Sequence, residues 1–548
     1  MQYLVARMQL RPCTGLQEAV MQVLLQLLPL VLSAAAAILI AWRATPPVVK
    51  ARLAALQSGI ARARKPIMLV TDFATAHHLL VRGSSAGSFS NRPPSMAPSA
   101  VLSGRRYHNI NSAPYGQLWR ALRSNLTSGV LHPTRLRHYA AARRRALHRL
   151  AADLREQQLA DDGVEALAAE SIRSAVFGLV STMCFGDGGV DAAVVRAMAD
   201  VQTELVLSLS AVRTFAFVPF LAVSKLVYRG RWNKLAAIRR KQEELYLPLI
   251  DGCRRRRGRD DDDSDGTPPS YVRTLLDLRV PVELDGDHDS SGGEQTQQRR
   301  LEDGELVGLC SEFLGSGTES VSAALQWIMA NLIKRPDMQD AVRREIDAAV
   351  DADAEEVGEE VLGKLDLLNA VILEALRLHP TIKFGFREVM QEDQVVHDGH
   401  RIPVGTKMVF PLEALARDKT AWDEPDEFMP ERFHGCCAGG ESTKKLLSVA
   451  AEMKMLPFGG GRRMCPAIGV SLLHIGYFMA NLVREFEWRE AEGGEHAGVQ
   501  LHPDATVEMF NFMERPLRAR LVPLRRPGGG YVKSQVGRDE ALDCQTGH

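Results

Sequence analysis

One short stretch of the chain places a cysteine in a setting suited to binding a metal. Residues 457–467 read Pro-Phe-Gly-Gly-Gly-Arg-Arg-Met-Cys-Pro-Ala, and an apolar run follows Cys465 directly. Glycines let the backbone approach closely, a helix N-terminus favours negative charge, and nearby arginines lower the pKa of a thiol. A lone cysteine is more often a buried structural residue. The combined pattern favours a thiolate that binds a metal ion.

A second stretch, Ser-Gly-Thr-Glu-Ser over residues 316–320, has the residue types needed to move protons. It lies within a mostly apolar segment, Leu301 to Leu332, that is predicted to form one long helix. Glu319 supplies an acid and Ser320 a hydroxyl. Gly317 and Thr318 precede them, and glycine weakens the helix there so that water molecules can take part in a proton relay. The alternative interpretation is a run of small residues that packs against a neighbouring helix.

Composition excludes several classes of protein. The chain has 548 residues, of which 45% are hydrophobic, and its 67 basic and 67 acidic residues give no net charge. A nucleic-acid-binding protein normally shows a basic excess. The eight cysteines are scattered and form no CxxC pair, so a disulfide scaffold, a zinc finger and an iron–sulfur protein are all disfavoured.

Residues 19–42 are almost entirely apolar and are long enough to cross ~30 Å of hydrocarbon as a helix. Arg43 and the Pro46-Pro47 pair end this run. A cleaved signal peptide is the alternative interpretation. The positive charges that follow the run favour a single membrane anchor with the bulk of the chain in the cytosol.

The remaining sequence predicts a mainly α fold with small β-sheets. We expect residues 1–18 to be a lumenal segment, 19–42 the anchor, 43–526 one catalytic domain and 527–548 a disordered tail. Within the domain, residues 254–300 carry opposed blocks of charge and are predicted to be a disordered surface loop. The predicted helices cover residues 166–184, 232–253, 301–332, 338–350, 365–378 and 466–486, and the predicted strands cover residues 66–71, 394–396, 407–410, 507–513 and 517–522.

Taken in order along the chain, these motifs resemble the cytochrome P450 family. The cysteine loop matches Phe-x-x-Gly-x-Arg-x-Cys-x-(Gly or Ala) with Phe458, Gly461, Arg463, Cys465 and Ala467. The stretch at 316–320 resembles the family's oxygen-binding segment, with serine in place of threonine at its last position. The resemblance extends over residues 65–522. Residues 126–133 and 324–332 are similar to those of plant microsomal P450 enzymes, nearest to plant family 89.

The resemblance implies a role for each candidate residue. Cys465 would be the axial ligand of haem b, within a loop formed with Phe458, Gly461 and Ala467. The residues proposed to contact the haem propionates are Trp119, Arg123, Arg387 and Arg463. Glu319 and Ser320, with Gly317 and Thr318, would serve oxygen activation. Glu374 and Arg377 of an E-x-x-R motif, with Arg432 of Pro-Glu-Arg-Phe (430–433), would form a structural triad.

The resemblance also implies a function. The protein would be a haem-thiolate monooxygenase that inserts one oxygen atom from O2 into a small lipophilic substrate in plant secondary metabolism. Electrons would come from NADPH through cytochrome P450 reductase, docked on a basic surface that includes Arg120, Arg135, Arg137 and Arg462. It would reside at the endoplasmic reticulum as a single-pass protein. Because the segment between Pro47 and Pro66 is short for the family, a haem-binding relative without oxygenase activity (an isomerase, a dehydratase or a degenerate protein) stays the alternative.

Overall fold

The computed structural model divides the chain into residues 1–65 and residues 66–548, and only the second unit is described below. The structure describes residues 66–82, 89–93, 109–160, 166–187, 190–209, 228–257, 270–282, 297–390, 396–397, 400–435, 454–491, 498–505, 507 and 509–524. The predicted anchor at residues 19–42 and the predicted tail lie outside these ranges. Within them, no helix has both the length and the apolar character needed to cross a membrane.

The described part of the chain is mainly helical. Its α-helices are α3 (Phe73–His77), α5 (Gln117–Gly129), α6 (Pro133–Leu136), α7 (Ala140–Ala160), α8 (Ala168–Phe185), α9 (Ala192–Leu209), α12 (Arg229–Arg257), α13 (Tyr271–Asp277), α14 (Asp303–Ile333), α15 (Pro336–Ala349), α16 (Glu359–Leu362), α17 (Asp366–Leu378), α18 (Leu412–Ala416) and α20 (Ile468–Glu485). Its strands are β1 (Ile67–Leu69), β2 (Val280–Pro281), β3 (Gln298–Arg299), β4 (Phe384–Glu388), β5 (Val396–His397), β6 (His400–Arg401), β7 (Lys407–Pro411), β8 (Phe486–Arg489) and β9 (Arg520–Pro523).

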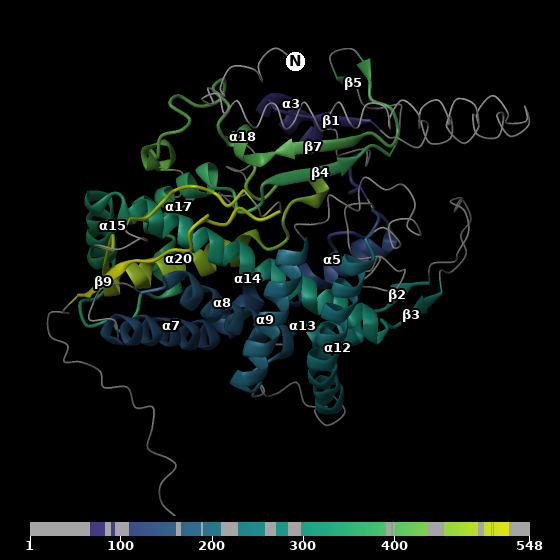
Figure 1. Ribbon diagram of the computed structural model, residues 1–548, viewed down its shortest axis with the longest axis horizontal. Helices are drawn as coiled ribbons and strands as arrows, with labels where there is room; N and C mark the ends of the chain where they lie inside the picture. Colours follow the sequence, from purple (N-terminus) through teal and green to yellow (C-terminus); the bar gives the residue numbers. More distant parts are fainter. Residues whose placement is uncertain are drawn as a thin grey trace, which may run out of the picture. The chain divides into compact units, whose positions relative to one another are not determined.

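Helix α14 is the longest element and runs through the middle of the helical part (Figure 1). It begins with a capping box, in which the Glu305 carboxylate accepts the backbone N–H of Glu302 at 2.7 Å. This exchange satisfies backbone N–H groups that the first helical turn leaves without partners. Helices α8, α12, α17 and α20 all pack on α14, which explains why most of its residues are buried.

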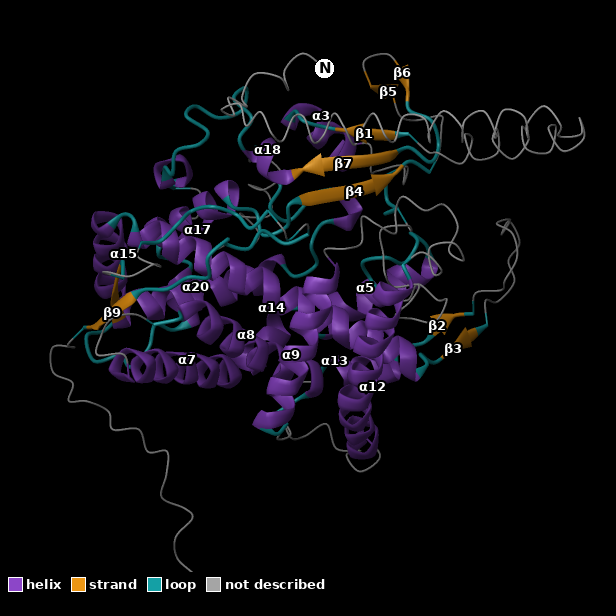
Figure 2. Cartoon of the chain, in the orientation of Figure 1, coloured by secondary structure: helices purple, strands orange, loops and turns teal. Residues whose placement is uncertain are grey.

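The strands gather in small sheets, and the largest has the short helices α3 and α18 beside it (Figure 2). Its order is β1-β7-β4, with β1 parallel and β4 antiparallel to β7. In the described part of the chain, β1 is therefore an edge strand, and Ile67 and Leu69 expose 66% and 58% of their surface. At the other end of the fold, β8 follows α20 directly and pairs with β9.

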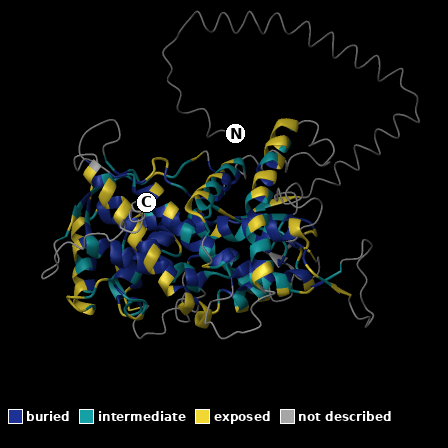
Figure 3. Cartoon of the chain, turned by 90° about the horizontal axis from the view of Figure 1, so that it is seen from below, coloured by how far each residue is buried: buried dark blue, intermediate teal, exposed yellow. Residues whose placement is uncertain are grey.

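The main hydrophobic core lies among α7, α8, α14, α17 and α20. Figure 3 shows buried residues gathered in the interior and exposed residues on the outer helix faces. Two aromatic side chains join α14 to the loops beyond α17 and α20. The ring of Trp327 stacks on His379 at a centroid distance of 4.1 Å, and its indole N–H donates to the Asn511 carbonyl at 2.7 Å. The core thus fixes α14 relative to the C-terminal segment.

Most long helices begin and end within a few residues of their predicted limits, but two expectations differ from the structure. Residues 254–300 are not one continuous loop, because they include α13 and the β2–β3 hairpin. Helix α13 forms there because Ser270 caps it and Tyr271, Val272 and Leu275 are buried. In addition, residues 507–513 make only isolated bridges, such as Ile382 with Phe510, in place of the predicted strand.

His379 makes the stability of this core sensitive to acid. Burial, and then Arg417, Arg377 and Arg335, lower its pKa from 6.5 to about 3. Below pH 6.5 the unfolded chain binds a proton that the folded chain cannot accept, so the free energy of unfolding falls as the pH falls from 6.5 towards 3. One such group removes about 2 kcal/mol between pH 6.5 and pH 5.

We therefore expect His379→Gln to reduce the pH dependence of the free energy of unfolding in this range. Denaturant unfolding at several pH values measures the slope. His502→Gln, which changes an exposed histidine, is the matched control and should keep the slope of the unmodified chain. Equal slopes for His379→Gln and the unmodified chain would contradict the prediction.

Candidate functional site

The loop before α20 has a backbone that only glycine adopts readily. Gly459 and Gly461 have φ values of +70° and +68°, in the left-handed region. The loop closes because the Cys465 N–H donates to the Phe458 carbonyl at 2.9 Å, and the Met464 N–H donates to the Gly461 carbonyl at 3.0 Å. This geometry places Cys465 directly before the N-terminus of α20.

The Cys465 sulfur faces the helix start, where the Ala467 N–H points at Sγ with an N···S distance of 3.4 Å. We expected the arginines to lower the thiol pKa, but the net effect in the structure is the opposite. The protein packed around the sulfur raises the pKa of Cys465, and the Ala467 N–H, Arg123 and Arg92 offset only part of this increase. The polypeptide alone therefore favours the thiol, and a cation bound at Sγ would displace its proton.

Four arginines converge near Cys465, and only three of them were predicted. Arg123 comes from α5, Arg387 from β4 and Arg463 from the cysteine loop, while Arg92 lies just after the isolated bridge at Asn91. Sequence analysis missed Arg92, because a single arginine in a loop carries no pattern of its own. The only signal available was its place in the run Asn-Arg-Pro-Pro at residues 91–94.

These guanidinium groups are costly to keep charged. Burial lowers the pKa of all four, and for Arg463 the value falls to about 9. Repulsion by Arg92 and Arg463 lowers the pKa of Arg387 further, and Arg387 and Arg463 expose only 4% and 5% of their surface. Positive charges this close require anions, so the arginine cluster (Arg92, Arg123, Arg387 and Arg463) is suited to a ligand with carboxylate groups.

The structure gives two of the predicted anion-binding residues a different contact. Arg463 donates from Nε, Nη1 and Nη2 to the carbonyls of Ser90, Ile110 and Ala113, at 2.6, 3.0 and 2.6 Å. The Trp119 indole N–H also donates to the Ile110 carbonyl, at 3.1 Å. Both side chains therefore hold the backbone around the site.

Arg123 and Arg387 touch the cysteine loop from two sides. Arg123 stacks on the Trp119 ring at 5.3 Å and donates to the Met464 carbonyl at 2.6 Å. Arg387 donates to the Gly460 carbonyl at 3.2 Å. Each side chain thus both positions the loop and adds positive charge beside Cys465.

On α14, the predicted acid and hydroxyl lie on different faces. Glu319 is 3% exposed and binds Arg173 of α8, with Nη2 2.6 Å from Oε1. Ser320 is half-buried and donates to the Ser316 carbonyl one turn earlier, at 2.7 Å. The residues are brought close along the helix, but a proton passing between them needs a water molecule or a movement of Glu319.

The neighbours of Glu319 in the motif have packing roles. Gly317 allows close approach of α8, since a Cβ placed there would lie 3.1 Å from Val180 Cγ1. Thr318 is fully buried, and its hydroxyl has no hydrogen-bond partner in the described structure. Gly317 and Thr318 therefore fit the interpretation of this stretch as a helix-packing motif, and the chemical role of Glu319 and Ser320 stays a prediction.

The three residues of the predicted structural triad lie together. Arg377 binds both carboxylate oxygens of Glu374, at 2.7 and 2.8 Å, and both side chains are fully buried. Arg432 approaches the same carboxylate, with Nε 3.5 Å from Oε1. The Arg377 guanidinium also donates to the carbonyls of Ala416, Pro425 and Glu427. It therefore joins α17 to the coil that leads towards the cysteine loop.

Arg377→Leu should destabilise the chain by about 3–5 kcal/mol, because it leaves the Glu374 carboxylate buried without its partner. Chemical denaturation measures the loss. Arg417→Leu is the matched control, since it breaks partly exposed pairs with Glu413 and Asp426 and should cost about 1 kcal/mol. If both variants lose a similar free energy of unfolding, the buried pair contributes no more to stability than the partly exposed ones.

A small apolar cluster forms where three distant segments meet. Val206 of α9 packs with Val507 and Phe510, and Ile382 and Phe512 lie against them. The resemblance to P450 enzymes implies a substrate pocket lined by residues 98–111, 206–217 and 381–386, which include Val206 and Ile382 but not residues 507–512. Residues 98–108 and 210–217 of the expected lining lie outside the described ranges.

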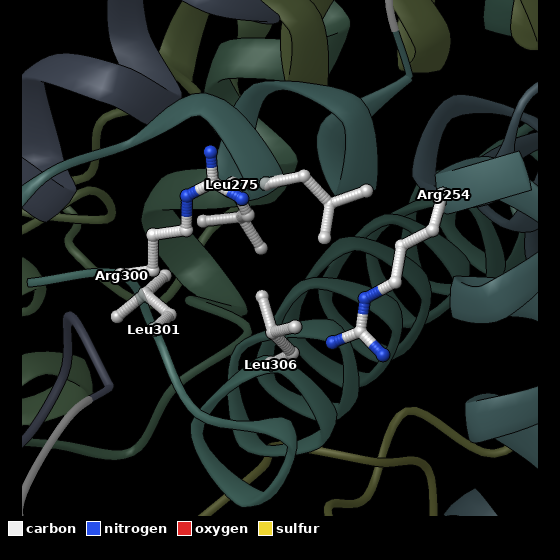
Figure 4. Close-up of a pocket in the computed structure, with 6 residues that line it drawn as sticks. Arg254, Leu275, Arg300, Leu301 and Leu306 are labelled. Atoms are coloured by element: carbon white, nitrogen blue, oxygen red, sulfur yellow. The ribbon is translucent and has the colours of Figure 1, made fainter. Parts of the chain in front are cut away.

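A separate cavity of about 330 Å³ lies between the end of α12, α13 and the start of α14 (Figure 4). Leucines 275, 276, 301 and 306 line it between Arg254 and Arg300. None of these residues belongs to the predicted site, and Arg254 is already paired with Asp251 and Asp303. This cavity is therefore separate from the predicted site at Cys465.

Comparison with known proteins identifies the family. The sequence profile named "Cytochrome P450" matches residues 59–503, which is most of the chain. The chain is a cytochrome P450. Cytochrome P450 89A9 from Arabidopsis thaliana is 35% identical over 469 residues, which cover 84% of this chain and 85% of that protein.

More distant relatives of this P450 are named oxygenases. Amorpha-4,11-diene 12-monooxygenase from Artemisia annua is 26% identical over 80% of the chain and 79% of that protein. Tabersonine 6,7-epoxidase isoform 1 from Catharanthus roseus is 26% identical over 73% of the chain and 72% of that protein. Together with the family match, they make the chain a P450 monooxygenase, a class that uses haem held by a cysteine thiolate.

The described residues fit a haem group. Cys465 is the one cysteine in the described ranges that is not fully enclosed by the core, whereas Cys184, Cys253 and Cys310 are buried. Within the described ranges, the arginine cluster beside it has too few carboxylates to balance its charge, and two haem propionates would supply them. The fit rests on this excess of positive charge next to a thiol.

Proposed function

We propose that this P450 inserts one oxygen atom from O2 into a small lipophilic substrate, with electrons supplied by NADPH through cytochrome P450 reductase. The observation that carries the proposal is the Cys465 sulfur at the start of α20, surrounded by the arginine cluster. Bound haem supplies the activation of oxygen and its transfer. The apolar contacts of Val206, Ile382 and Phe510 support a substrate with little charge.

Each part of the site contributes a separate step to this proposal. Cys465 would hold the iron through Sγ, and Arg123 and Arg387 would hold the propionates while they brace the cysteine loop. Glu319 would pass protons towards Ser320, taking them from water that reaches it beside Arg173, whose side chain is 24% exposed. The Glu374–Arg377–Arg432 group would hold the coil that leads to the cysteine loop in position against α17.

The charge around the cysteine loop supports docking of an acidic electron donor. Arg120 and Arg462 both lie over the ring of Tyr115, each at 5.0 Å, and both are exposed. Two exposed cations next to the thiolate loop would attract an acidic flavoprotein surface. We further propose that residues 19–42 anchor the protein in the endoplasmic reticulum membrane, on the strength of their apolar sequence.

Cys465→Ala tests the haem assignment. We expect the membrane-expressed protein to show a red-shifted, thiolate-type Soret band in a reduced carbon-monoxide difference spectrum, and we expect the variant to lose it. Cys310→Ala is the control, because it changes a buried cysteine outside the site and should keep the band. A thiolate band that survives in Cys465→Ala would refute the ligand assignment.

Glu319→Gln tests proton delivery and separates the two functional classes. Loss of a general acid should slow reductase-supported oxygen consumption by about 10²-fold, with the thiolate band unchanged. Glu413→Gln, at a partly exposed pair with Arg417, is the control and should have no effect. If the unmodified protein has the band but consumes no oxygen with reductase and NADPH, a haem-binding relative without oxygenase activity becomes the better description.

A further inference from the structure

Glu312 is a second acidic residue on α14, and it holds a turn of the chain that lies 202 residues away. Its carboxylate accepts the backbone N–H groups of Ile110 and Asn111 at 2.8 and 2.7 Å. Burial raises the pKa of Glu312, and these two N–H groups, with Arg92 and Arg463, offset part of that increase. The carboxylate is thus held by backbone N–H groups on one side and faces cations on the other.

The turn of residues 109–113 is held at both ends. Within it, the Ala113 N–H donates to the Asn109 carbonyl at 2.9 Å, as in a single helical turn. Its leading N–H groups meet Glu312, and its carbonyls at Ile110 and Ala113 meet Arg463. A peptide turn has its positive end at the N–H groups and its negative end at the carbonyls, so both contacts have the favourable sign.

This arrangement connects α14 to the cysteine loop through hydrogen bonds alone. Glu312 fixes the turn, the turn fixes Arg463, and Arg463 lies two residues before Cys465. The Trp119 indole N–H joins at the same carbonyl of Ile110. A change at Glu312 would therefore reach the cysteine loop without any contact between Glu312 and Cys465.

The negative charge of Glu312 also acts on the arginine cluster. Burial lowers the pKa values of Arg92 and Arg463, and the negative charge of Glu312 raises them again in part. Without it, the arginine cluster would lose a counter-charge that the protein itself provides. The cluster would then depend on bound carboxylates alone to offset its repulsion.

We propose that Glu312 is a positioning residue of the haem site, which acts through the turn of residues 109–113 on Arg463 and so on the loop that carries Cys465. The inference rests on the proposed function, because it takes Cys465 to be the ligand of the haem iron. Glu312 of α14 would thus be one of the residues that position the Cys465 thiolate.

Glu305 offers a matched control on the same helix. It is 4% exposed, and its carboxylate accepts bonds from Arg299 and from the Glu302 N–H, neither of which belongs to the turn or to the arginine cluster. Glu305→Gln therefore removes a buried carboxylate of α14 and its share of stability. If Glu312 had only a structural role, Glu312→Gln would likewise lose stability and leave the binding of haem unchanged.

The experiment compares the full-length, membrane-expressed protein with Glu312→Gln, Glu312→Ala and Glu305→Gln. In reduced carbon-monoxide spectra, we expect both Glu312 variants to convert thiolate-type haem to the thiolate-less form and to bind haem about tenfold more weakly. Glu312→Gln, which can still accept one N–H, should lie between Glu312→Ala and the unmodified protein. Glu305→Gln should lower the unfolding midpoint and keep the ratio of the two bands.

Hydrogen exchange of the peptide that contains residues 109–113 provides a readout independent of haem. Exchange should speed up in both Glu312 variants and stay unchanged in Glu305→Gln. Unchanged band ratios and exchange in the Glu312 variants, beside an unmodified protein with a thiolate band, would overturn the inference. An unmodified protein without that band would refute the proposed function instead, and the exchange data would still decide whether Glu312 holds the turn.

Discussion

The constraint on which this structure depends is the need to keep positive charge close to a sulfur inside the protein. Arginine suits this task because it stays protonated where lysine would lose its proton. Each guanidinium still needs acceptors for its N–H groups, and backbone carbonyls at Ser90, Ile110, Gly460 and Met464 supply many of them. The loops around the site are therefore ordered by the same charges that prepare it for an anionic ligand.

Helix α14 carries two acidic residues about two turns apart along nearly the same face, and each has different partners. Glu319 points to α8 and its ion pair with Arg173, while Glu312 holds the turn before α5. In the same stretch of α14, Ser316 and Ser320 each donate to the carbonyl four residues earlier, which tends to bend a helix. One helix thus links a carboxylate suited to proton delivery with a carboxylate that braces the thiolate loop.

Long elements could be predicted well because their apolar residues repeat over many turns. The expected helix over residues 301–332 forms at 303–333, and the expected helix over 365–378 forms at 366–378. Strand β4 was missed, because Phe-Gly-Phe-Arg-Glu is short and alternates only weakly. Arg92 and Glu312 were missed for a different reason: single charged residues have meaning only beside partners that the sequence does not reveal.

The sequence by itself determined the family and the order of the motifs, and it predicted Cys465 as the ligand, because these depend on residue types at short spacing. It also determined that a glycine turn precedes α20, since only glycine accepts the φ values found there. Tertiary structure alone decided where each charge finds its partner. Burial outweighs the arginines in setting the pKa of Cys465, and Arg463 donates to carbonyls 350 to 373 residues away. Such contacts depend on packing between distant segments, which local sequence does not specify.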